Sequence, residues 1–209
     1  MYLLRKIWIP AVALALAAAA CSSLKEPSPK IDFYTPEYSP PRLRNLKTLS
    51  ATLRVERFTV APLYNTHQMI YRDRSFRRQA YVYHRWRSNP GDLLTYFLSR
   101  DLRESGLFRA VSPWETQLPS KYAVEGSVDE FVEWESEEVW KAVLAVSVTL
   151  LAEGEPDITK RVLFQQTFSS AKPCAQKNAA GFAGAMSEAM AEISLEVIKS
   201  IYDHLSHRE

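Results

Sequence analysis

The clearest regular pattern in the chain covers residues 122–151. From Tyr122 to Trp134 apolar residues alternate with acidic ones, whereas Val139 to Leu151 is almost continuously apolar and rich in valine. A period of two predicts a strand with one solvated face, and an unbroken apolar run predicts a central strand. We therefore expect a long hairpin that turns near residues 135–138, with the acidic side chains on its outer face.

Shorter segments predict the remaining strands. Residues 51–62 alternate as far as Pro62, and residues 67–86 contain two short tyrosine-rich strands around a polar turn at residues 72–75. Apolar and β-branched residues also suit strands at 107–113 and 161–171.

Two segments show helical spacing instead. In residues 88–108, Asn89 is a candidate N-cap, Pro90 suits the first helical position, and apolar residues recur every three or four positions. Residues 177–205 carry a longer apolar stripe from Phe182 to Leu205. The order of elements predicts an α+β domain in which two main helices pack against one mostly antiparallel sheet.

The start of the chain has a different composition. Arg5 and Lys6 precede an almost wholly apolar run, residues 7–20, whose last alanines lead directly to Cys21. This pattern is typical of a secretory signal peptide, and the run is shorter than the roughly 20 apolar residues of a membrane-spanning helix. Its end resembles the lipobox of bacterial lipoproteins, Leu-small-small-Cys, with Ala18 in place of the usual leucine.

The lipobox resemblance implies that residues 1–20 are removed and that Cys21 is acylated, which anchors the protein to a membrane. The alternative is an ordinary signal peptide cleaved near Ala20, with Cys21 incidental. Ser22 resembles the residue found in lipoproteins that are sorted to the outer membrane. We therefore expect a lipid-anchored protein on the periplasmic face of the outer membrane, with the inner membrane as the alternative.

Residues 21–50 form the second predicted segment. They contain five of the twelve prolines of the chain, which favours an extended tether. The aromatic residues of "IDFYTPEY", residues 31–38, offer an arm that packs back on the domain. The predicted division is therefore a signal peptide (1–20), a lipidated tether with an aromatic arm (21–50) and a folded domain (51–209).

Composition and motifs argue against several kinds of chemistry. The net charge of +2 gives no reason to expect nucleic-acid binding, and Cys174 has no partner for a disulfide once Cys21 is acylated. The sequence has no glycine-rich phosphate loop, no G-x-S-x-G motif and no zinc-ligand spacing. His204 and His207 are three residues apart, but their position near the C-terminus favours a structural role. We predict no enzymatic activity, no metal and no cofactor.

Two charged clusters stand out in the predicted domain. Residues 72–87 contain six arginines, and residues 129–138 contain six acidic residues. They are either solvated strand ends that partly neutralise each other or docking surfaces, since arginine and aromatic residues together are enriched at interface hot spots. The candidate partner-binding residues are Arg72, Arg74, Arg77, Arg78, Tyr81, Tyr83, Arg85 and Trp86.

Several segments occur in an order that resembles a known family. They include "FYTPEY", "VERFTVAPLY", "YVYHRW", "LSRDLRESGLFRAV", "YAVEGSVDEF" and "KAVLAVSVTL". This succession resembles the ABC-type transport auxiliary lipoproteins, the group that includes paraquat-inducible protein C. The resemblance implies a non-catalytic envelope lipoprotein that assists a transporter with mammalian-cell-entry (MCE) domains in moving lipids between membranes. Only Cys21 carries over as a defined functional residue. The alternative is a periplasmic lipid carrier with its own hydrophobic cavity.

Overall fold

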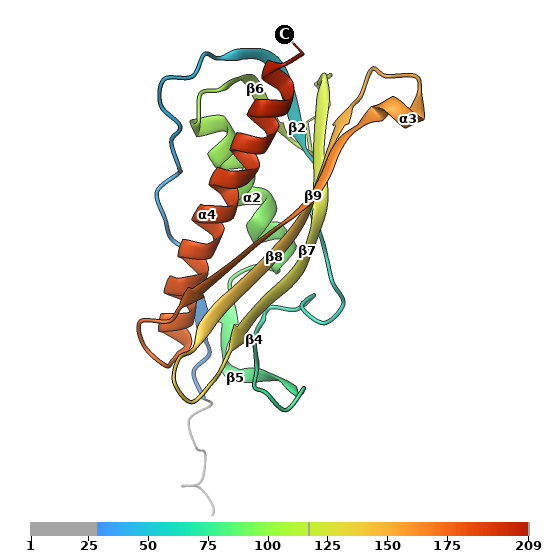
Figure 1. The fold of residues 1–209 in the computed structure, drawn as a ribbon. Helices are drawn as coiled ribbons and strands as arrows, with labels where there is room; N and C mark the ends of the chain where they lie inside the picture. The colour runs from blue at the N-terminus through green and yellow to red at the C-terminus, as the bar shows by residue number, and fades with distance from the viewer. Residues whose placement is uncertain (1–28, 117, 209) are drawn as a thin grey trace, which may run out of the picture. The chain divides into compact units, whose positions relative to one another are not determined.

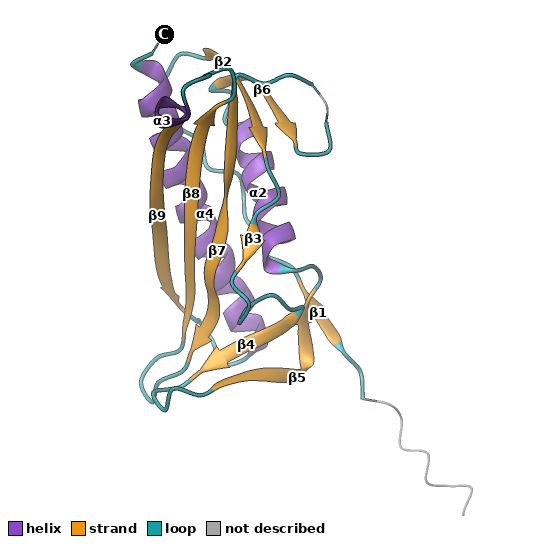
Figure 2. Cartoon of the chain, turned by 90° about the vertical axis from the view of Figure 1, so that its right-hand side faces the viewer, coloured by secondary structure: helices purple, strands orange, loops and turns teal. Residues whose placement is uncertain are grey.

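Strand β7 (Tyr122–Trp134) is the strand on which the sheet is built. In the computed structural model it pairs antiparallel with β8 (Lys141–Ala152) along its whole length. Strand β8 pairs in turn with β9 (Val162–Pro173), which forms one edge of the sheet. The predicted hairpin is confirmed, and it lies at the centre of the sheet (Figure 2).

The other side of β7 is shared by three short strands. β2 (Leu49–Val55), β3 (Thr59–Val60) and β4 (Gln68–Arg72) pair with it one after another, and each pairing is parallel. The strand predicted at 51–62 is therefore interrupted at residues 56–58, where the chain moves to a new level along β7.

Three further strands complete the sheet. β6 (Phe108–Pro113) pairs parallel with β2, β5 (Arg78–Trp86) pairs antiparallel with β4, and β1 (Asp32–Tyr34) pairs parallel with β5. The structure describes residues 29–116 and 118–208. Within these ranges the sheet is mixed: its longest ladders are antiparallel, while the short pairings beside β7 are parallel.

Both main helices lie on the same face of the sheet (Figure 1). Helix α2 (Pro90–Glu104) begins after Asn89, whose side chain accepts a hydrogen bond from the Gly91 amide, as the sequence predicts. Helix α4 (Ala179–Ser206) packs against β8 and β9, and the single-turn helix α3 (Ile158–Arg161) connects those two strands. The α+β class with two main helices is confirmed.

The segment from residue 31 to residue 50 lies within the same compact unit as the rest of the domain, Ile31–Glu209. Strand β1 is part of this segment, and the Tyr38 ring stacks on Phe97 of α2 at 5.3 Å between centroids. Farther along, the Tyr202 hydroxyl of α4 donates to the Lys47 carbonyl at 3.0 Å. Residues 31–50 therefore contact both main helices, α2 through Tyr38 and α4 through Lys47.

A buried carboxylate holds the arm and both helices together. Asp101 of α2 is wholly buried. It accepts hydrogen bonds from the Tyr38 hydroxyl at 2.8 Å, from Ser194 of α4 at 2.6 Å and from Arg100 at 2.8 Å. Burial, together with the Asp101 charge, raises the pKa of Tyr38 above its ordinary value. The arm is thus attached through a hydroxyl that stays protonated.

We predict that Asp101→Ala lowers the free energy of unfolding by about 3 kcal/mol, because the buried Ser194 and the partly buried Tyr38 and Arg100 lose their shared acceptor. Urea unfolding of the full chain, followed by circular dichroism, measures the change. Asp203→Ala, which removes an exposed aspartate of α4, is the matched control and should have little effect. Equal stability of the two variants would contradict the assigned role of Asp101.

Candidate functional site

The arginine-rich stretch and the acidic stretch meet at one end of the domain. The turn between β4 and β5 lies beside the turn between β7 and β8, and the Glu135 amide donates to the Arg72 carbonyl at 2.8 Å (Figures 1 and 2). An open groove of about 410 Å³ separates the two turns. It is lined by Asp73, Arg74, Ser75, Glu135, Ser136, Glu137 and Trp140.

The arginines of β4 and the following turn have different environments. Arg72 forms an ion pair with Glu130 at 3.5 Å, and its guanidinium lies over the Trp134 ring at 5.4 Å. Arg77 forms an ion pair with Asp73 at 3.6 Å, whereas Arg74 lines the groove with its side chain exposed. The charges of the two clusters are therefore partly neutralised.

Strand β5 presents a mixed aromatic and cationic surface. Tyr83 is 47% exposed and Val82 is 65% exposed, and Phe33 of the neighbouring β1 is 49% exposed. Arg85 is half-buried on the same strand. The exposed Arg78 donates to the Tyr64 hydroxyl at 3.3 Å. Tyr83 and Arg78 are thus exposed on the outside of the domain.

Trp86 does not belong to this surface. Its indole is wholly buried and packs edge-on against Phe131 at 5.1 Å and against Phe182 of α4 at 5.3 Å. The last residue of β5 points between the sheet and the helix, so Trp86 is part of the core and is corrected from a contact residue to a packing residue. Tyr81 is also turned inward, and its hydroxyl donates to Glu133 at 2.7 Å.

Glu133 is buried in the core, although the alternation of apolar and acidic residues in β7 predicts that it faces solvent. The register between β7 and β8 shifts between Val128 and Glu130, and this bulge turns every later residue of β7 to the opposite face. Glu133 is therefore wholly buried, although the sequence predicts it on the outer face. The sequence contains a sign of this bulge, because the apolar residues Val128 and Phe131, which are both buried, are three positions apart, whereas strict alternation would separate them by two.

The environment of Glu133 is weakly polar. Besides the Tyr81 hydroxyl, it lies 3.9 Å from the Cys174 sulfur, which acts as a weak donor. Burial raises the pKa of Glu133 to about 7, and burial next to Glu133 raises the pKa of the Cys174 thiol to about 12. Cys174 is therefore a protonated thiol rather than a reactive thiolate.

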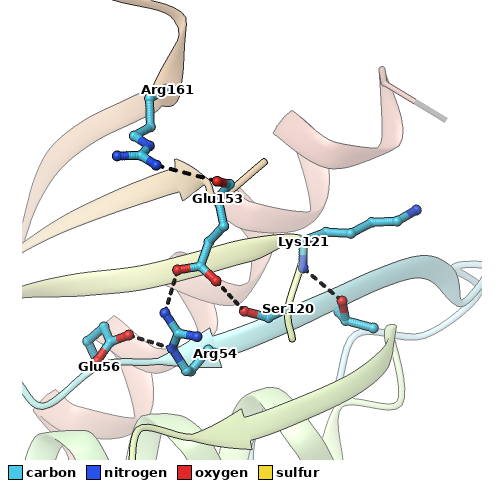
Figure 3. A network of polar contacts seen from close by, with 7 residues as sticks. Arg54, Glu56, Ser120, Lys121, Glu153 and Arg161 are labelled. Atoms are coloured by element: carbon cyan, nitrogen blue, oxygen red, sulfur yellow. Dashed lines mark hydrogen bonds and ion pairs between the residues drawn. The ribbon is translucent and has the colours of Figure 1, made fainter. Parts of the chain in front are cut away.

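A second polar network lies at the other end of β7, where Arg54 of β2 reaches Glu153, which follows β8 (Figure 3). Arg54 forms ion pairs with Glu56 at 2.6 Å and with Glu153. Glu153 also accepts from the Ser120 hydroxyl at 2.9 Å, and its carbonyl accepts from Arg161 at 3.4 Å. Arg54 is paired with both carboxylates, so the network connects the end of β2 to the chain that follows β8.

Other candidate sites have structural explanations or lie outside the described ranges. The His204 and His207 rings contact backbone carbonyls four residues earlier on α4. Within residues 29–116 and 118–208, no group of three or more His, Cys, Asp or Glu side chains is arranged to hold a metal ion. No helix in that part of the chain is long and apolar enough to cross a bilayer. Cys21 and the predicted signal peptide lie outside the described residues.

We predict that Glu133→Gln removes a pH dependence of stability. The pKa of Glu133 is raised on folding from 4.5 to about 7. Its neutral form is therefore favoured in the folded chain, and the stability this contributes below pH 4.5 is lost as the pH rises through 7. The full chain should lose about 2–3 kcal/mol between pH 4.5 and pH 8, and Glu133→Gln should lose much less.

Urea unfolding at a series of pH values measures this effect. Glu125→Gln, which changes an exposed acid on the same strand, serves as the control and should keep the pH dependence of the native chain. An unchanged pH profile in Glu133→Gln would show that Glu133 titrates normally.

Comparison with known proteins gives a family and a fold. A family model described as "ABC-type transport auxiliary lipoprotein component" matches residues 36–198. The crystal structure of protein XCC0632 from Xanthomonas campestris, assigned to family DUF330, aligns with a TM-score of 0.76 at 20% identity, covering 85% of this chain and 98% of that one. A hypothetical protein from Chlamydia trachomatis aligns with a TM-score of 0.51 at 9% identity, covering 75% and 98%.

No curated protein sequence matches the chain. The two crystal structures show that the fold is shared, since their identity to this chain is too low to show more. The family model covers most of the domain, from the arm that precedes β2 to the last turns of α4. The chain therefore belongs to the family of ABC-type transport auxiliary lipoproteins.

Proposed function

We propose that this protein is a non-catalytic, lipid-anchored accessory component of an MCE-type ABC transporter, which moves lipids or other hydrophobic molecules between the membranes of a bacterial envelope. The observation that carries the proposal is the family match over residues 36–198. The lipobox-like segment ending at Cys21 supports the anchoring part of the proposal.

The anchor and the domain are separated by a short stretch of chain. Residues 31–50 are packed on the domain, so residues 21–30 remain as the tether in this proposal. Ten residues reach at most roughly 35 Å when fully extended. Acylation of Cys21 would hold the domain close to the membrane surface, and Ser22 favours the outer membrane as that membrane.

The exposed surface of β1 and β5 is the proposed contact with the MCE subunit. It combines Phe33, Val82 and Tyr83 with the cations Arg78 and Arg85, a composition that suits an interface hot spot. The guanidinium of Arg72, on the neighbouring strand β4, already interacts with Glu130 and with the Trp134 ring.

The packing of the core favours docking over the alternative of a lipid carrier. Large side chains of α4 and of the sheet fill the space between them, and Phe131, Phe182, Met186, Met190 and Ile193 are each less than 2% exposed. A lipid chain would have to displace this core, which is costly in a close-packed interior. The packing therefore supports a role in which the domain contacts other proteins.

We predict that Cys21→Ala abolishes acylation. Cells grown with a clickable palmitate analogue should incorporate it into the wild-type protein, which should then fractionate with the outer membrane. The Cys21→Ala variant should stay unlabelled, whereas Cys174→Ala should be labelled like wild type. Label in Cys21→Ala, or its absence from wild type, would contradict the proposed anchor.

We also predict that the β1–β5 surface crosslinks to the MCE subunit. A photoreactive benzoylphenylalanine in place of Tyr83 should capture that subunit in cells. The same residue in place of Tyr96, which is 65% exposed on α2, is the control and should not. Crosslinks from position 96 but not from position 83 would move the contact surface to the helix.

A further inference from the structure

The tip of the β4–β5 turn carries an aromatic side chain in an unusual state. Phe76 is 94% exposed, the highest value among the exposed large hydrophobic residues described. Its φ is 64°, in the left-handed region where a bulky residue is strained. Neither packing nor turn geometry explains a phenylalanine here, and such backbone outliers are enriched at functional sites.

Two arginines lie close to Phe76 in the sequence of the turn. Arg74 and Arg77 flank it within the turn, and both are exposed. The carboxylate of Asp73 accepts hydrogen bonds from the Ser75 amide, at 2.8 Å, and from the Ser75 hydroxyl, and it forms an ion pair with Arg77 at 3.6 Å. The hydrogen bonds donated by Ser75 lower the pKa of Asp73. The turn therefore carries one strongly exposed apolar side chain and two exposed arginines.

Besides Asp73, further acidic residues face the tip from the neighbouring β7–β8 turn. Glu135 and Glu137 face Arg74 across the groove between the two turns. Lys177 donates to the Glu137 carbonyl at 2.7 Å and adds a positive charge beside them. The overall charge of this end is thus mixed, so that any attraction to an anionic surface is local to the tip.

The tip lies at the same end of the domain as strand β1. Figure 2 shows β1, the β4–β5 turn and the β7–β8 turn toward one end of the domain, and α3 at the other. The twelve residues of β8 separate these ends by roughly 40 Å. Strand β1 pairs with the last residues of β5, with Asp32 opposite His84, so the segment that leads from Cys21 joins the domain one strand length from the tip, on the strand that follows it.

We propose that the β4–β5 tip contacts the phospholipid headgroups of the membrane that holds Cys21, and so orients the domain with this end toward the bilayer. Phe76 would enter the headgroup layer, where aromatic residues are favourable, while Arg74 and Arg77 bind lipid phosphates. Because the acyl chains already hold the domain at the surface, a weak contact is sufficient to set its orientation. The proposal rests on the anchoring part of the proposed function.

The test compares two spin-label positions with matched surroundings. Ser75→Cys and Thr159→Cys each replace a hydroxyl residue that hydrogen-bonds an aspartate two positions earlier, Asp73 or Asp157. Each site adjoins a strongly exposed apolar residue, Phe76 at 94% or Ile158 at 78%, at opposite ends of the domain. Both labels are placed in a Cys174→Ser background of the lipoprotein purified from membranes.

The labelled protein is reconstituted into vesicles of phosphatidylethanolamine and phosphatidylglycerol. Oxygen, which partitions into lipid, should relax the label at 75 more than a water-soluble nickel complex does, and the reverse should hold at 159. Adding Phe76→Ser, or Arg74→Glu with Arg77→Glu, should abolish the lipid exposure at 75. Circular dichroism confirms that each variant is folded.

Three results would overturn parts of the proposal. Equal water exposure at 75 and 159 in protein that floats with the vesicles would disprove the membrane contact while leaving the anchor intact. Protein that does not float at all would disprove the anchoring on which the proposal rests. A label at 75 that becomes protected only when the MCE subunit is added would assign the tip to a protein contact instead.

Discussion

The central constraint in this fold is that one strand supplies the backbone hydrogen bonds for two different sets of partners. On one side, β7 pairs with the whole of β8; on the other, it is divided among β2, β3 and β4. Each short strand joins the sheet at a part of β7 whose backbone N–H and C=O groups on that side are not used by the other two. The position of both charged turns follows from this, since β4 pairs with the last residues of β7 and so brings its turn beside the β7–β8 turn.

Local patterns were sufficient to predict the two main helices and the longer strands, but not β1, α3, the break between β2 and β3, or every buried face. The helices, the long hairpin and the N-cap at Asn89 follow from spacing and capping rules that act within a few residues. The parallel pairings of β2, β3 and β4 depend on contacts far apart in sequence. The sequence therefore predicts the fold class but not the order of the strands in the sheet. Glu133 shows the limit most clearly, because one extra residue at the bulge reverses the pattern that precedes it.

The sequence predicted that strand β5 is exposed, but not which of its residues face solvent. Arginine and tyrosine in alternation indicate an exposed strand, and Tyr83 and Arg78 are accessible. Trp86 occurs in the same alternation but fills the core, because the end of β5 lies beneath α4. The sequence alone does not distinguish Phe76 from a core phenylalanine, because exposure at a turn tip is a property of the folded backbone.

The attachment of the arm has a mechanical consequence. Tension applied from the side of the N-terminus would enter the domain first at β1, which is joined to β5 by only three residue pairs. If that short ladder yields, the load passes to Tyr38 and its bond to Asp101, which lies between the two helices rather than within the sheet. The arm can therefore detach in two steps, first the β1–β5 pairing and then the Tyr38–Asp101 hydrogen bond, while the β7–β8–β9 ladders stay intact.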